Sequence, residues 1–255
     1  MKKSIIWIVT ALFLVLIAGI ILYSLVRPCE LETHEYEIKE CFKDITIIAD
    51  TADIQFILSE NLTSYVVCEE EKNAKHSVAV KDNTLRIEVY DNQKWYEHIA
   101  INISAPKITV YLGKGEMGNI SIKSDTGNIS LNNINASGKI AVEADTGNIK
   151  LAACDACEVS INNDTGNIIL DDVIATGKLA IETDTGNVKF EACDASEVFI
   201  ETDTGDVTGS FLTDKVVFAE SDTGNIDVPK VIADEKCEII TDTGNIKITI
   251  EQKNS

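Results

Sequence analysis

Residues 120–131 read ISIKSDTGNISL, and residues 140–151 read IAVEADTGNIKL. The tetrapeptide Asp-Thr-Gly-Asn that they share recurs along the second half of the chain, once as Asp-Thr-Gly-Asp, at steps of 19 or 20 residues. The seven copies start at Asp125, Asp145, Asp164, Asp184, Asp203, Asp222 and Asp242. Such a regular period indicates one small structural unit that is stacked several times.

Apolar residues flank each tetrapeptide at fixed offsets. In the first copy they are Ile120 and Ile122 before it and Ile129 and Leu131 after it, and these positions are apolar in nearly every other copy. The two-residue step within each pair is that of a β-strand, and most of the residues are β-branched. Because a unit with two short strands cannot bury its own apolar face, the copies must stack on one another. The sequence therefore predicts an all-β protein whose residues 118–250 form a parallel β-solenoid of about seven coils.

The tetrapeptide itself is typical of a turn. Asp can accept hydrogen bonds from backbone N–H groups just after it, Gly tolerates a positive φ, and stacked Thr and Asn side chains can bond to their equivalents in adjacent coils. We therefore interpret the glycines as structural turn residues: Gly127, Gly147, Gly166, Gly186, Gly205, Gly224 and Gly244. The alternative is that the seven aspartates form a calcium file, as in β-rolls. One carboxylate per coil offers few ligands to that ion, so the prediction is no metal and no cofactor.

The N-terminus carries a candidate membrane anchor. Residues 5–26 are uncharged and, as a helix, would span about 33 Å, enough to cross a bilayer. A cleaved signal peptide is the alternative, but no small-residue cleavage site ends the segment. Lys2 and Lys3 predict that residues 1–4 stay in the cytoplasm and that the chain after the anchor lies outside. Residues 27–44 would then be a linker next to the membrane.

Residues 45–117 are less regular and are predicted to form a β-rich cap over the first coil. Residues 45–56 resemble a degenerate coil, residues 77–90 predict a hairpin with a turn at Asp82-Asn83, and residues 108–112 predict a strand. Glu69, Glu70 and Glu71 are predicted to lie in a solvated loop. Three aromatic residues near the end of this region could cover the core or contact a ligand: Tyr90, Trp95 and Tyr96. At the other end, residues 251–255 form a polar tail.

The cysteines and histidines do not suggest a reactive site by their spacing. Cys154, Cys193 and Cys237 occupy apolar columns and are predicted to be core thiols. Cys154 and Cys157 form a lone C-x-x-C without the context of a zinc or redox domain. A disulfide between Cys41 and Cys68 is conceivable in an oxidising compartment. The three histidines, His34, His76 and His98, have no neighbouring Cys or His at metal-ligand spacing.

The charge balance restricts the partners. The chain has 22 Lys and Arg against 42 Asp and Glu, a net charge of −20, which makes nucleic acid an unsuitable partner. Cationic peptides, envelope proteins and glycans remain as candidates. A polysaccharide-active β-helix enzyme is the less favoured alternative, because no arginine follows Arg86 and the repeated aspartates have a structural explanation.

The repeated turn, the strand ITVYL at residues 108–112, the segment GNISIKS at residues 118–124 and the N-terminal apolar segment together resemble the bacterial "putative adhesin" family, a domain of unknown function. The resemblance covers most of residues 45–250 and implies a β-solenoid in an envelope protein with a surface binding or sensing role and no catalytic residues. Gly113 stands where family members often have proline after the Tyr-Leu pair. The expected function is a non-enzymatic binding or scaffold module anchored in the bacterial cell membrane.

Overall fold

The computed structural model describes residues 26–27, 31–59, 63–71, 74–91, 101–102 and 106–251. Within them the protein is all-β, with 19 strands in one sheet and a separate parallel pair, β1 (Val26–Arg27) with β8 (Ile101–Asn102). The described residues contain no helix that is long and apolar enough to cross a bilayer. The predicted anchor, residues 5–26, lies outside these residues except for Val26.

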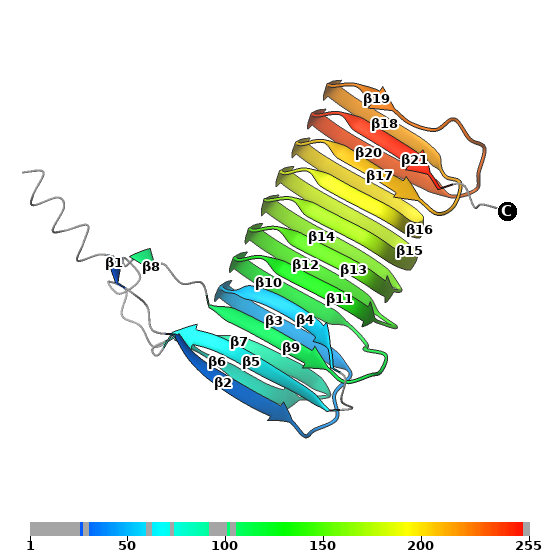
Figure 1. Cartoon of the computed structure of the whole chain (residues 1–255). Coiled ribbons are helices and arrows are strands. Elements are labelled where there is room, and N and C mark those ends of the chain that lie inside the picture. The colour runs from blue at the N-terminus through cyan, green and yellow to red at the C-terminus, as the bar shows by residue number, and fades with distance from the viewer. Residues whose placement is uncertain are drawn as a thin grey trace, which may run out of the picture.

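The large sheet winds into a rod of parallel coils (Figure 1). Each repeat coil has one strand before the Asp-Thr-Gly corner and one after it, and we name the two sides of the rod face A and face B accordingly. Face A contains β10 (Ile120–Thr126), β12 (Lys139–Thr146), β14 (Glu158–Thr165), β18 (Val216–Thr223) and β20 (Lys236–Thr243). Face B contains β11 (Ile129–Asn135), β13 (Ile149–Ala156), β17 (Val207–Phe211), β19 (Ile226–Asp227) and β21 (Ile246–Ile250). Two long strands, β15 (Ile168–Thr185) and β16 (Val188–Thr204), start on face B and end on face A.

The registers confirm the predicted columns. Ile120 pairs with Ile140, Ile129 with Ile149, and the two long strands pair Leu170 with Phe190 in the same ladder. These side chains are 0–1 % exposed, so stacking of the coils buries the face that no single coil could bury alone. The degenerate coil is also confirmed: β3 (Asp44–Thr51) and β4 (Asp53–Leu58) pair in parallel with β10 and β11.

Coil order in space differs from coil order in the chain at both ends of the rod. At the N-terminal end, the β3–β4 coil lies between the β10–β11 coil and a coil made of β7 (Thr84–Asp91) and β9 (Lys107–Leu112). At the C-terminal end, the last coil in the chain, β20–β21, inserts between β16–β17 and β18–β19 (Figure 1). The rod thus extends beyond the seven repeat coils, and its last strands have a parallel partner on each side.

Lys215 connects chain segments at the place where the β20–β21 coil inserts. Its side chain is fully buried, and its Nζ lies 2.5 Å from Asp194 Oδ1, 2.5 Å from Glu235 Oε2 and 2.6 Å from the carbonyl oxygen of Ala195. Asp194 belongs to the β16 coil, whereas Glu235 directly precedes β20. The ammonium therefore ties together the segments on either side of the inserted coil.

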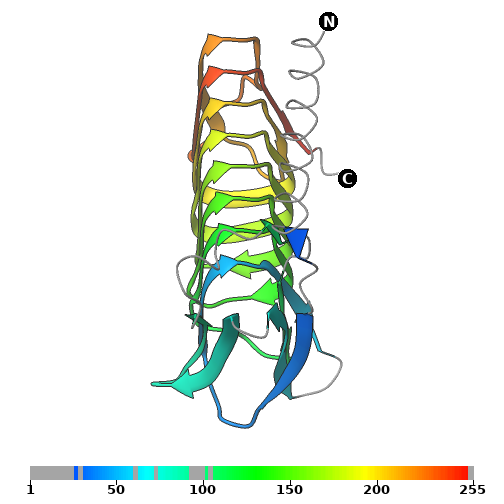
Figure 2. The ribbon, with the colours of Figure 1, turned by 90° about the vertical axis from the view of Figure 1, so that its left-hand side faces the viewer.

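A cap of antiparallel strands closes the N-terminal end (Figure 2). β2 (Leu31–Ile38) pairs with β5 (Ser64–Glu71), which pairs with β9, while β6 (Ala74–Lys81) pairs with β7. The predicted hairpin is confirmed, since Asp82 and Asn83 have φ of 50° and 62°, as a two-residue hairpin turn requires. Residues 31–38, expected in a linker next to the membrane, are thus part of the cap.

The core thiols are as predicted. Cys154, Cys193 and Cys237 are 0 % exposed, and burial raises the pKa of the Cys193 and Cys237 thiols to about 12. The disulfide that the sequence left open is not formed, because Cys41 is exposed, Cys68 is buried, and both are free. Cys68 points into the cap rather than toward the surface, as the alternation of its strand dictates.

Candidate functional site

The Asp-Thr-Gly corners stack along one edge of the rod. All seven aspartates are exposed, and the threonines that follow them are in register from coil to coil, as for Thr126 with Thr146 and Thr185 with Thr204. The structure therefore brings the predicted aspartates into one exposed file. Calcium coordination by this file is not evident from the geometry, because its carboxylates do not gather into a group of three or more within the described residues.

The glycines are required mainly because adjacent coils approach closely. A Cβ at Gly147 would lie 2.0 Å from the carbonyl oxygen of Gly127, and a Cβ at Gly166 would lie 2.0 Å from that of Gly147. The same contact recurs at the other repeat glycines, at 1.9–2.1 Å. Positive φ, the predicted reason, applies only to Gly127, Gly147 and Gly166. Steric exclusion of Cβ is thus the general cause.

The predicted asparagine ladder is confirmed. The backbone N–H of Asn148 donates to Asn128 Oδ1 at 3.1 Å, and that of Asn167 donates to Asn148 Oδ1 at 3.0 Å. Asp53 and Asp206 hold the asparagine position of their own coils and accept in the same way. Asp53 accepts from the backbone N–H of Asn128, and Asp206 accepts from that of Asn245 at 2.7 Å. The ladder crosses the exchanged coils, so it satisfies corner amides along the whole stack.

The residue before the Asp has a role in several copies that the sequence analysis missed. Asn163 Nδ2 donates to the carbonyl oxygens of Gly147 and Gly166, and Thr241 Oγ1 donates to that of Gly205. These residues face inward and are 0–1 % exposed. In the described chain these inward side chains donate to the corner carbonyls, a contact separate from the N–H contacts predicted for the Asp side chains. The column of small, mostly polar residues before each Asp was the available signal.

Glutamates add to the exposed aspartate file on face A. Glu182 pairs with Glu201 across adjacent coils, and each lies two residues before a file aspartate, Asp184 or Asp203, so all four carboxylates point outward. Within the described chain no Lys, Arg or His makes an ion pair with these four. Glu143 and Glu220 hold the same position in other coils, and only Glu143 has a cation, Lys123 Nζ at 2.5 Å. We call Glu182, Asp184, Glu201 and Asp203 the acidic edge.

The predicted aromatic contact site lies outside the described residues, except for the backbone of one member. Tyr90 lies on β7, but its side chain, like residues Trp95 and Tyr96, falls outside the described part of the chain.

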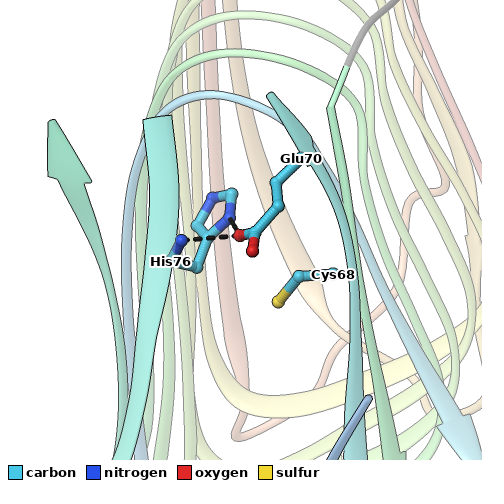
Figure 3. Close-up of side chains that lie close together, drawn as sticks. All are labelled: Cys68, Glu70 and His76. Carbon is cyan, nitrogen blue, oxygen red and sulfur yellow. Dashed lines mark hydrogen bonds and ion pairs between the residues drawn. The ribbon is translucent and has the colours of Figure 1, made fainter. Parts of the chain in front are cut away.

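A polar cluster inside the cap was not predicted (Figure 3). The alternation of β5 directs Val66, Cys68 and Glu70 inward, all 0 % exposed, although Glu70 was expected in a solvated loop. That expectation was wrong because a run of three glutamates hides the two-residue period that continues from Val66 and Cys68. The cluster lies at the end of the apolar interior, where the cap closes the rod.

Two histidines contact the buried carboxylate. His76 on β6 donates its backbone N–H to Glu70 Oε2 at 2.6 Å, and its Nδ1 lies 2.8 Å from the same oxygen. On β2, His34 is directly opposite Cys68 in the antiparallel register, and its Nδ1 lies 3.1 Å from Glu70 Oε1. Side chains at opposite positions share a face, so pairing of β2 with β5 brings His34 into the cluster. Residues distant in sequence thus converge through strand pairing.

Burial also affects the thiol of the cluster. Desolvation, followed by the nearby Glu70 carboxylate, raises the pKa of Cys68 to about 12. Within the described residues, Cys68, Glu70 and His76 are the one group of three or more potential metal-ligating side chains, with ligand atoms all within 4.8 Å of one another. The sequence spacing did not reveal it because its members come from separate strands.

The fold has relatives among known proteins. A family model described as Toastrack DUF4097 matches residues 42–255. A "putative adhesin" from Parabacteroides distasonis is 13% identical, with 86% of this chain and 97% of that chain covered and a TM-score of 0.52. A "putative adhesin" from Bacteroides fragilis is 17% identical over 86% and 97% of the two chains, with a TM-score of 0.47. No curated protein matches the chain.

Proposed function

Because the chain belongs to the Toastrack DUF4097 family, whose model matches residues 42–255, we propose that it is a non-enzymatic binding module of the bacterial cell envelope. Residues 5–26 anchor it in the membrane, the rod lies outside the cytoplasm, and the acidic edge binds cationic segments of peptides or envelope proteins. The solved structure from Parabacteroides distasonis carries the name "putative adhesin", which supports a binding role rather than an enzymatic one.

The observation that carries the proposal is the acidic edge, an exposed row of carboxylates that form no ion pair with a Lys, Arg or His of the described residues. Neighbouring coils lie about 4.8 Å apart, so the acidic edge places like charges close together on a rigid scaffold. Two lysines elsewhere on the rod are engaged with glutamates, Lys139 with Glu158 at 2.7 Å and Lys189 with Glu191 at 2.7 Å. Repulsion along the edge is relieved when a polycation binds, which favours association.

A binding experiment with the full chain in detergent micelles tests the acidic edge. We expect a labelled oligolysine peptide to bind at low ionic strength and to lose at least about tenfold in affinity when salt rises to about 0.5 M. The variant Glu182→Gln/Asp184→Asn/Glu201→Gln/Asp203→Asn should weaken binding by about tenfold or more at low salt, since it removes four adjacent charges.

The matched control changes the same net charge elsewhere. Glu35→Gln, Glu40→Gln, Asp214→Asn and Asp234→Asn alter exposed carboxylates away from the acidic edge. Equal loss in both variants would mean that only overall charge matters, and it would contradict a binding role for the edge. Affinity that does not change with salt would contradict the electrostatic mechanism.

The membrane topology is tested by labelling intact cells with an impermeant maleimide. Cys154 and Cys157 provide an internal control, because both thiols are free but the first is buried and the second is exposed. In a Cys29→Ser/Cys41→Ser background we expect labelling from outside the cell that a further Cys157→Ser change abolishes and a Cys154→Ser change leaves intact. Labelling that requires cell lysis would place the rod in the cytoplasm and overturn the topology.

A further inference from the structure

The cap cluster offers the donor set of a transition-metal site. It combines a thiol, a carboxylate and an imidazole from Cys68, Glu70 and His76, with the ligand atoms within 4.8 Å of one another (Figure 3). Four ligands around a tetrahedral zinc, at about 2.0–2.3 Å from the metal, lie roughly 3.3–3.8 Å from one another. Small side-chain rotations would therefore be enough to bring the three donors to coordination distance.

A second observation supports a cation site at this cluster. Glu70 is fully buried, and its Oε1 makes no hydrogen bond, although its Oε2 accepts two from His76. His34 Nδ1 is also buried without a hydrogen bond, only 3.1 Å from that oxygen. Buried polar atoms without a hydrogen bond are rare and costly, and a cation between these two would satisfy both.

We propose that Cys68, Glu70 and His76, with His34 as the fourth ligand, bind zinc or a closely similar divalent transition metal. Thiolate, imidazole and carboxylate together suit zinc, whereas calcium and magnesium prefer oxygen ligands alone. The side chain of His34 is 36% exposed, so it gives a metal ion access to the otherwise buried site. Four protein ligands indicate a structural rather than a catalytic metal.

The ligands would join three parts of the cap. β2, β5 and β6 each contribute, yet within the described strands β2 and β6 are not paired with each other, and β5 meets β6 at only one residue pair, Glu71 with Ala74. A metal bound to all three strands would link β6 with β5 and β2 at a place where backbone hydrogen bonds hardly connect them. This role is independent of the acidic edge, which lies on coils farther along the rod.

Cobalt binding to the full chain in detergent micelles tests the site, because cobalt(II) replaces zinc and has a visible spectrum. Titration of metal-free protein should give one cobalt per chain with a thiolate-to-metal charge-transfer band, and zinc should abolish the band by displacement. Cys68→Ser should remove the band. Cys193→Ser should retain it, because this matched control removes a thiol that is equally buried but far from the cluster.

A second variant keeps the test valid if Cys68→Ser does not fold. Glu70→Gln conserves size and can still accept from His76, and we expect it to bind cobalt at least tenfold more weakly while its circular dichroism is unchanged. Absence of a charge-transfer band in the native protein, or a band that persists in Cys68→Ser, would overturn the proposal. The cluster would then be a hydrogen-bonded structural group without metal.

Discussion

Gly166→Val is expected to lower the free energy of unfolding by about 4 kcal/mol or more, or to prevent folding. The Cβ of any other residue would lie 2.0 Å from the carbonyl oxygen of Gly147, which belongs to the backbone of the adjacent coil and cannot move alone. In addition, φ at this position is 140°, a conformation in which a β-branched residue is strained. Urea unfolding followed by circular dichroism measures the change.

Gly115→Val is the matched control for this experiment. No heavy atom lies within 4 Å of the position that its Cβ would occupy, and Gly115 precedes the first repeat corner. We expect its unfolding midpoint to stay close to that of the native protein. If the two variants unfold at similar urea concentrations, close approach of the corners is not what requires glycine.

Lys215→Ala is expected to cost about 3–5 kcal/mol, because it leaves a partly buried carboxylate pair without its cation. Asp194 and Glu235 both contact the Lys215 ammonium at 2.5 Å, and their like charges would then face each other. Loss of this contact should loosen the exchanged C-terminal coil first. Hydrogen exchange in β20 and β21 should therefore increase more than exchange in β12 and β13.

Two further variants separate charge from packing. Lys215→Met retains most of the apolar stem and should still destabilise, since the missing charge is the main effect. Lys123→Ala removes an exposed partner of Glu143 and should change stability little, as surface ion pairs generally do. Equal effects of Lys215→Ala and Lys123→Ala would contradict a role for Lys215 in holding the coil exchange.

Local regularity made most of the rod predictable. The period of 19–20 residues, the two-residue alternation of Ile120 with Ile122 and the glycine in each copy all follow from constraints that act within one coil and its neighbour. The asparagine ladder was predictable for the same reason. The polar residue before each Asp, such as Asn163, could also have been found from its column.

The cap cluster could not be found in this way. His34, Cys68 and His76 come from three strands, and no spacing in the sequence shows that His34 stands opposite Cys68. The run Glu69-Glu70-Glu71 gave no sign of which carboxylate faces inward. Only the register of β2 on β5 brings these side chains together.

The repeating coil, its buried columns and the exposed aspartate file follow from the amino-acid sequence, because each depends on contacts between equivalent positions one period apart. The order of the coils at both ends of the rod and the assembly of the polar cluster depend on long-range packing and strand pairing. Stacking is almost equally favourable for any two repeat coils, so the repeat cannot specify which neighbour each end coil takes. Specific contacts make that choice: Lys215 with Asp194 and Glu235 at one end, and strand pairing in the cap at the other.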